Sequence, residues 1–210
     1  MVIGVTGGVG AGKSTVLKIL QEKYGAKILF SDDIAKELME PGKSAYTAVV
    51  KTFGPEILED ECKDCHLNPA EKTPHLRRID REKLAKIVFA DEEKLALLNS
   101  LTHPAVKEEI LSRIASYYAE DKNALIVVEA ALLIEAGYED ILDSLWVVYV
   151  EKEERISRLM RDRGYSREKA LSIMENQLSD EVFKAHADFL INNTGTHEET
   201  QKQIEEFFDQ

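Results

Sequence analysis

The residues with the clearest chemistry lie near the start of the chain, where residues 7–14 read GGVGAGKS. This run matches the pattern G-x-x-x-x-G-K-[ST], with an apolar run before it and an amphipathic helical pattern after it. Glycines let backbone N–H groups turn inward around an anion, and the helix that begins here adds its dipole. Lys13 can reach the β- and γ-phosphates of a nucleotide, while the Ser14 hydroxyl can bind Mg²⁺. The pattern therefore predicts a phosphate-binding loop for a nucleoside triphosphate.

The phosphate-binding loop identifies a nucleotide but not a reaction. GTPases usually carry an Asn-Lys-x-Asp motif for guanine, and this motif is absent from the sequence. Motor and transport ATPases are typically larger than a chain of 210 residues. We therefore expect an ATP-dependent kinase that acts on a small molecule. The alternative from another class is a regulator that binds ATP as a switch and shows little turnover.

A pair of carboxylates, Asp32 and Asp33, follows the apolar run at residues 27–30. Ligands of parallel sheets bind beyond the carboxyl ends of the strands, so one of the two could orient or deprotonate the hydroxyl that attacks ATP. An aspartate that precedes a helix can equally serve as its N-cap. Position alone leaves both interpretations open.

Arginines gather between Arg155 and Arg167, in a chain whose formal net charge is −12. Arg155, Arg158 and Arg161 recur at intervals of three, which places them along one face of a helix, and Gly164 predicts the end of that helix. A basic helix–turn–helix suits a lid that closes over ATP phosphates. The alternative is a solvated helix that forms ion pairs with its acidic neighbours.

The acidic balance argues against a protein that binds nucleic acid backbone over its whole surface. No apolar run approaches the ~18 residues needed to span a membrane, and the first residues carry no charged leader. We expect a cytoplasmic protein without a nucleic-acid or membrane partner, and the oligomeric state stays open. Cys62 and Cys65 lack the second pair or the histidine spacing of a zinc site, so we interpret them as reduced cysteines in a surface loop.

Apolar runs predict five strands, near residues 2–6, 27–30, 125–129, 145–150 and 189–192. Helical patterns separate them, which predicts an α/β fold with a five-stranded parallel sheet flanked by helices on both faces. The helical segment between the second and third strands is too long for one crossover and is the natural place for a substrate-binding part. Asp80 and Thr196 are expected to cap helices, and Pro104 to begin one.

The motifs occur in an order that resembles one family, dephospho-CoA kinase, which phosphorylates the ribose 3′-hydroxyl of dephospho-CoA to make coenzyme A. The matching segments are residues 4–16, 31–37, 40–42, 79–89, 103–104, 132–135, 158–160 and 187–195. They cover nearly the whole chain, which is far more specific than the phosphate-binding loop alone. A kinase for another small acceptor, such as a nucleoside monophosphate or shikimate, is the main rival.

The resemblance implies a single domain over residues 1–210 with the P-loop NTPase fold. Its core would comprise about residues 1–32, 121–152 and 181–210, with a helical acceptor-binding part at about 33–120 and a lid at about 153–180. ATP would lie on the loop with Mg²⁺ held by Ser14. The residues implied for ATP are Gly10, Ala11, Gly12, Lys13, Ser14 and Thr15.

The resemblance also implies catalytic roles. Aligning on the Glu-Pro-Gly run at residues 40–42 selects Asp32 as the carboxylate that orients or deprotonates the acceptor hydroxyl. Lys13 and Arg158 would stabilise the phosphoryl group in transfer. Asp162 stands where the family has a second arginine, so Arg161 or Arg163 must supply that charge. We favour Arg161, because it lies three residues from Arg158 on the same helical face, and expect Arg155 to contribute less.

On the acceptor side, the resemblance implies contacts from Arg81, His103, Leu132 and Leu133. His103 can also be read as a helix-end residue before Pro104. Phe30 and Ala131 depart from the family pattern, which usually has an aspartate and a proline at these places.

Overall fold

The structure is a computed structural model, and it describes residues 1–60 and 77–209. The cysteine pair, Cys62 and Cys65, lies outside these described residues. The chain forms two compact units, one of residues 1–30 with 113–210 and the other of residues 31–112.

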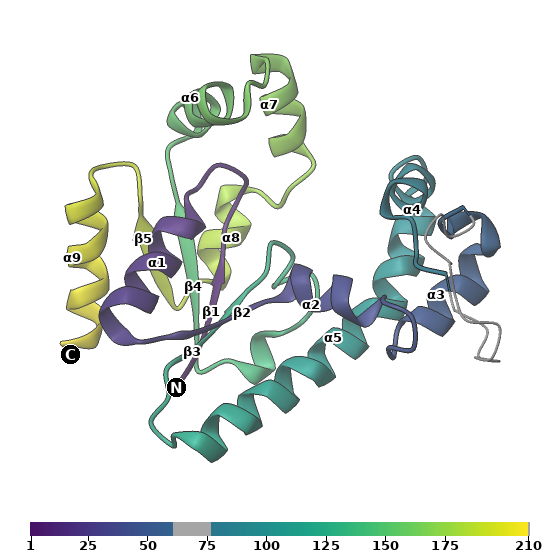
Figure 1. Cartoon of the computed structure of the whole chain (residues 1–210). Coiled ribbons are helices and arrows are strands. Elements are labelled where there is room, and N and C mark those ends of the chain that lie inside the picture. Colours follow the sequence, from purple (N-terminus) through teal and green to yellow (C-terminus); the bar gives the residue numbers. More distant parts are fainter. Residues whose placement is uncertain (61–76, 210) are drawn as a thin grey trace. The chain divides into compact units, whose positions relative to one another are not determined.

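The first unit is built on a five-stranded parallel sheet (Figure 1). Its strands, in chain order, are β1 (Val2–Thr6), β2 (Lys27–Phe30), β3 (Ile126–Glu129), β4 (Ser144–Tyr149) and β5 (Phe189–Asn192). Their spatial order is β2-β3-β1-β4-β5. The predicted strands are all confirmed, with ends that differ by no more than one residue from the expected positions.

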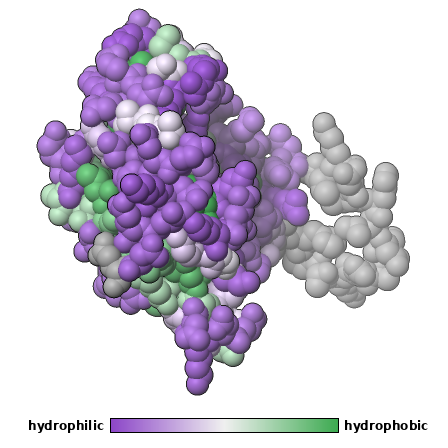
Figure 2. All heavy atoms as spheres, turned by 90° about the vertical axis from the view of Figure 1, so that its left-hand side faces the viewer, coloured by the Kyte–Doolittle hydropathy of each residue, from purple (hydrophilic) through white to green (hydrophobic). Residues whose placement is uncertain are grey.

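Two helices, α1 (Lys13–Tyr24) and α9 (His197–Phe208), pack against one face of this sheet (Figure 1). The fully buried Trp146 ring of β4 is at the centre of this packing, 4.7 Å from the ring of Phe207. Because the apolar side of α9 turns toward the sheet, its outer side is hydrophilic. Figure 2 shows the surface on this side with hydrophilic residues over most of its area.

The opposite face of the sheet is covered by the segment between β3 and β4 and by α8 (Asp180–His186) (Figure 1). Gly4 of β1 faces this side, and Leu133 and Leu142 fill the space in which a side chain at Gly4 would lie. A short 3₁₀ helix, η2 (Glu139–Ile141), precedes β4. The sheet is therefore buried on both sides, as its continuous apolar strands predict.

The predicted helix–turn–helix consists of α6 (Lys152–Arg163) and α7 (Arg167–Glu175). Gly164 ends α6 with a φ of 63°, and Ser166 caps α7 by accepting a hydrogen bond from the Lys169 N–H. The two helices pack on each other through a small apolar cluster that includes Ile156, Leu159 and Ala170.

The second unit is helical, with its own apolar core. Its elements are α2 (Ser31–Leu38), α3 (Tyr46–Phe53), the 3₁₀ helix η1 (Pro55–Ile57), α4 (Arg81–Val88) and the first part of α5 (Glu92–Glu120). Val49 and Ile57 are fully buried in that core, where Leu84 of α4 also packs. Asp80 caps α4 as predicted, because its carboxylate accepts the N–H groups of Glu82 and Lys83.

The predicted helix start at Pro104 is wrong, because α5 continues through this residue. Proline removes one backbone donor from a helix, yet apolar residues on both sides of it are packed, such as Leu101 before it and the buried Val106 and Ile110 after it. This packing outweighs the local signal. Although α5 has 29 residues, no helix in the described part of the chain is long and apolar enough to cross a membrane.

Candidate functional site

The phosphate-binding loop joins the end of β1 at Thr6 to the start of α1 at Lys13. A backbone hydrogen bond of 3.1 Å from the Ala11 N–H to the Gly8 carbonyl tightens the loop. Gly12 precedes the helix with a φ of 83°, a conformation that side chains rarely adopt. A Cβ at Gly12 would also collide with the side-chain nitrogen of Asn193. Both the backbone and its neighbour therefore require glycine here.

The ammonium group of Lys13 is held at the loop by two oxygens. Its Nζ donates a hydrogen bond of 2.9 Å to the Gly7 carbonyl and lies 3.7 Å from Oε1 of Glu129. Glu129 ends β3, next to Val5 of β1 and to Phe30 of β2 in the sheet. Sequence reasoning did not select Glu129, although it is the charged residue that interrupts two apolar runs.

Ser14 and Thr15 follow Lys13 in the first turn of α1, where a helix exposes its N–H groups. The Ser14 side chain is exposed, and Thr15 is half-buried. Hydroxyl and carboxylate oxygens suit Mg²⁺, which commonly takes only one or two protein ligands beside substrate phosphates. The described residues hold no group of three or more His, Cys, Asp or Glu side chains that could bind a metal. Ser14 and Glu129 thus supply oxygens of the kind that a Mg²⁺–nucleotide complex uses.

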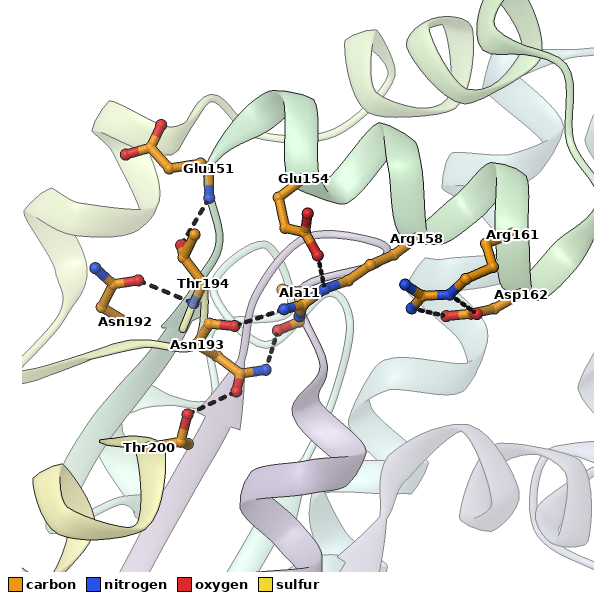
Figure 3. A network of polar contacts seen from close by, with 10 residues as sticks. All are labelled: Ala11, Glu151, Glu154, Arg158, Arg161, Asp162, Asn192, Asn193, Thr194 and Thr200. Carbon is orange, nitrogen blue, oxygen red and sulfur yellow. Dashed lines mark hydrogen bonds and ion pairs between the residues drawn. The ribbon is translucent and has the colours of Figure 1, made fainter. Parts of the chain in front are cut away.

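Of the two arginines selected from the sequence, Arg158 lies beside the loop. Its Nη2 donates a hydrogen bond of 2.9 Å to the main-chain carbonyl of Asn193, and its Nε binds Glu154 at 2.9 Å (Figure 3). Its Nη1 lies 3.5 Å from the place that a Cβ on Gly12 would take. The guanidinium group therefore lies next to Gly12, the residue before α1.

Arg161 is paired with its own neighbour instead. Two of its nitrogens bind the Asp162 carboxylate at 2.7 and 3.1 Å on the exposed surface of α6 (Figure 3). The hydrogen bond from Arg161 lowers the pKa of the Asp162 carboxyl. The structure thus brings Arg158, but not Arg161, to the phosphate-binding loop.

Arg155 is buried and holds the phosphate-binding loop through the loop's main chain. Its side chain is 5% exposed, and its Nε donates to the Val9 carbonyl at 3.1 Å. Its Nη1 binds Asp180 at 2.9 Å, while Oε1 of Gln177 accepts the Val9 N–H at 2.9 Å. Burial lowers the pKa of the Arg155 guanidinium and Asp180 opposes this, so the charge is paired inside the protein.

The acidic pair lies in the second unit, in the first turn of α2. Both side chains are exposed. Asp33 binds Nζ of Lys36 at 2.6 Å, whereas Asp32 forms no ion pair within the part of the chain that the structure describes. Asp32, which the alignment on residues 40–42 selects, is thus the carboxylate of the pair that Lys36 does not bind.

The residues implied for the acceptor lie in both units. In the second unit, Arg81 forms an exposed ion pair with Glu40 at 3.2 Å, and His103 is half-buried within α5. In the first unit, Leu132 is 44% exposed after β3, while Leu133 is fully buried under the sheet. The exposed Leu132 can therefore contact a ligand directly. The buried Leu133 packs against the sheet and supports the segment after β3.

Comparisons with known proteins point to one family. The model of the family described as dephospho-CoA kinase matches residues 1–199. The dephospho-CoA kinase of Carboxydothermus hydrogenoformans is 41% identical over 203 residues, which cover 97% of this chain and 90% of that protein. The dephospho-CoA kinase of Enterococcus faecalis is 37% identical over 209 residues, which cover 100% of this chain and 96% of that protein.

Solved structures agree on the fold. The crystal structure of TT1252 from Thermus thermophilus has a TM-score of 0.77 at 28% identity and covers 100% of this chain and 96% of that chain. The dephospho-CoA kinase from Campylobacter jejuni has a TM-score of 0.65 at 24% identity, covering 99% and 95%. A shikimate kinase from Acinetobacter baumannii has a TM-score of 0.53 at 17% identity, covering 99% and 92%. The last two likenesses concern the fold alone.

Proposed function

This chain belongs to the dephospho-CoA kinase family, and we propose that the residues around its phosphate-binding loop carry out the family's reaction. The enzyme transfers the γ-phosphoryl group of ATP to the ribose 3′-hydroxyl of dephospho-CoA, which gives coenzyme A in the last step of its biosynthesis. The observation that carries this conclusion is the family match over residues 1–199, which includes the whole loop between β1 and α1.

The acceptor is tested by incubating the protein with Mg·ATP and dephospho-CoA, AMP or shikimate, and by identifying the products by mass. We expect ADP and coenzyme A in equal amounts, and no phosphorylated product from AMP or shikimate. A phosphorylated AMP or shikimate would assign another acceptor. ATP binding without any turnover would indicate a regulator instead of a kinase.

We propose the following roles for the reacting groups. Asp32 accepts or orients the proton of the 3′-hydroxyl, whose oxygen forms the new bond to phosphorus. The bond between the γ-phosphorus and the β,γ-bridging oxygen breaks, and ADP leaves. Lys13 and Arg158 stabilise the charge on the phosphates as this bond breaks, and Arg161 assists after it leaves Asp162. Support comes from the position of Lys13 in the loop and of Arg158 beside Gly12.

We propose that ATP lies on Gly10–Thr15 and that Ser14 holds Mg²⁺ through its exposed hydroxyl. Bound Mg²⁺ neutralises charge on the β- and γ-phosphate oxygens. Glu129 would orient Lys13, because its carboxylate lies 3.7 Å from Nζ of Lys13. No step of this proposal requires a cluster of protein carboxylates.

For the acceptor side, we propose Arg81, His103, Leu132 and Leu133, within a helical part at about residues 33–120. The exposed charge of Arg81 suits the phosphate groups of dephospho-CoA, and the half-exposed Leu132 suits its apolar parts. We propose a core of about residues 1–32, 121–152 and 181–210 and a lid at about residues 153–180. We also propose a cytoplasmic enzyme without a nucleic-acid partner, which the net charge of −12 supports.

The lid arginines are tested by comparing Arg158→Ala with Arg161→Ala. Arg158→Ala is expected to lower kcat roughly 30-fold, the cost of a lost charged hydrogen bond in the transition state. Arg161→Ala is expected to lower kcat roughly tenfold. The effect is smaller because the wild-type Arg161 must first break its pair with Asp162, and this cost offsets part of what it contributes to the transition state. Steady-state kinetics at saturating ATP measure both changes. Arg163→Ala is the matched control on the same helix, and a larger loss there would assign the second arginine to Arg163.

A further inference from the structure

Asn193 connects three parts of the first unit that are distant in the sequence. It is 5% exposed and follows β5, and its Nδ2 donates a hydrogen bond of 2.8 Å to the Ala11 carbonyl of the phosphate-binding loop (Figure 3). Its Oδ1 accepts the Thr200 hydroxyl at 2.8 Å. Its main-chain N–H binds the Tyr149 carbonyl at 2.8 Å, and its own carbonyl accepts Nη2 of Arg158 at 2.9 Å.

The side chain of Asn193 can take only one orientation in this network. The Ala11 carbonyl accepts hydrogen bonds and never donates them, so the amide must present its NH₂ group to the loop. The amide oxygen then faces Thr200, whose hydroxyl is fully buried and serves as the donor. The Ala11 carbonyl therefore fixes which end of the Asn193 amide meets the phosphate-binding loop, and the Thr200 hydroxyl holds the opposite end.

Thr200 is itself held in place by the start of α9. Thr196 and Glu199 form a capping box, in which each side chain binds the backbone N–H of the other residue. Thr200 follows directly in the first turn of this helix. The rigid end of α9 is thereby connected to Ala11 through a single side chain, that of Asn193.

Close contact on the loop side supports the same connection. A Cβ on Gly12 would overlap Nδ2 of Asn193, and it would lie 3.5 Å from Nη1 of Arg158. Gly12 thus lets the amide and the guanidinium group approach the same point of the loop. Any shift of Asn193 moves both the loop and Arg158.

We propose that Asn193 is a positioning residue for phosphoryl transfer. Its side chain fixes the phosphate-binding loop at Ala11 while its main-chain carbonyl fixes Arg158, so one residue sets the spacing between two groups that hold the ATP phosphates. Thr200 acts through Asn193 by holding the oxygen of its amide in place. This inference rests on the roles proposed above for the loop and for Arg158.

The first test compares Thr200→Val with Thr200→Ser. Valine keeps the shape of threonine and removes the hydroxyl, whereas serine keeps the hydroxyl and removes a buried methyl group. Thr200→Val is expected to raise the Kd for Mg·ATP roughly fivefold, the fold-change of one neutral hydrogen bond, and Thr200→Ser less than about twofold. Thermal unfolding should show a similar loss of stability in both variants, because valine leaves the buried Oδ1 of Asn193 without its donor and serine leaves a small cavity. If ATP affinity follows Tm in both variants, Thr200 acts only in packing and the proposal is overturned.

The second test uses Asn193→Asp, which keeps the size of the side chain. At about pH 8 its carboxylate cannot donate to Ala11 and repels the ATP phosphates, so we expect the Kd for Mg·ATP to rise at least about 50-fold. Burial beside the Ala11 carbonyl should raise the pKa of the new carboxyl group, so that at about pH 5.5 partial protonation restores a donor and the ratio to the wild-type Kd at that pH falls. A Kd for Mg·ATP at about pH 8 within about fivefold of the wild-type Kd would overturn the proposal.

Both tests measure nucleotide binding without an acceptor, so they remain informative if dephospho-CoA is not the substrate. Circular dichroism at each pH confirms that the variants are folded. Steady-state kinetics with dephospho-CoA add kcat and KM as a second readout for the same variant. In Asn193→Asp, kcat should fall while the KM for dephospho-CoA stays within about threefold. Equal changes in both substrates' KM values would indicate general loosening and would contradict a positioning role.

Discussion

Replacement of Lys13 by alanine is expected to lower kcat by at least about 100-fold, because a lost phosphate clamp removes several kcal/mol of transition-state stabilisation. The Gly7 carbonyl and Glu129 already hold the ammonium group at the loop, so the charge is in place before ATP binds. The fold should persist, because Lys13 lies outside the apolar core. Steady-state kinetics and circular dichroism measure the two effects.

Lys18→Ala provides the matched control for this prediction. It removes the same charge from the same helix, where Lys18 forms an exposed pair with Glu22 at 3.8 Å. Such surface pairs contribute little, and the expected change in kcat is below about twofold. Near-normal turnover of Lys13→Ala would show that this lysine does not clamp the phosphates.

The sheet could be predicted because its three central strands, β3, β1 and β4, are buried on both faces and read as continuous apolar runs. All five residues of Val2–Thr6 are buried, and β4 is buried except at Tyr149. The helix caps at Asp80 and Thr196 were predictable for another reason, since a cap needs only side chains within three residues. Local chemistry of this kind is fully present in the sequence.

Local signals fail where tertiary packing opposes them. Pro104 favours a helix start, but the buried residues that follow it keep α5 continuous. Arg155 looks like its neighbours Arg158 and Arg161 in the sequence, yet it is buried against Val9. No spacing rule distinguishes a buried arginine from an exposed one on the same face.

In the candidate site, too, the contiguous residues could be predicted from the sequence and the long-range contacts could not. The loop itself is a contiguous motif, so Lys13 and Ser14 were found from the sequence. The side chains that hold the loop come from far along the chain, since Arg155 and Val9 differ by 146 in residue number and Asn193 and Ala11 by 182. Such contacts depend on the strand order β2-β3-β1-β4-β5, which places β4, and with it α6, beside β1. Sequence reasoning predicted the strands but not that order.

Asp32→Asn is expected to lower kcat by about 10²- to 10⁴-fold, the usual contribution of a group that takes a proton in the transition state. Asparagine can still orient a hydroxyl but cannot accept its proton at neutral pH. The dissociation constant of Mg·ATP should change less than about threefold, because the proposed role concerns the acceptor. Single-turnover measurements with dephospho-CoA separate the chemical step from product release.

Asp33→Asn tests the register that selects Asp32. Both carboxylates lie in the first turn of α2 and both are exposed, so the two substitutions change the same charge in nearly the same place. Asp33 is engaged by Lys36 at 2.6 Å, an exposed pair that contributes at most about 1 kcal/mol to stability. Its replacement should therefore lower kcat less than about threefold. A large loss in Asp33→Asn with a small one in Asp32→Asn would place the catalytic carboxylate at Asp33, and the alignment on residues 40–42 would be wrong by one position.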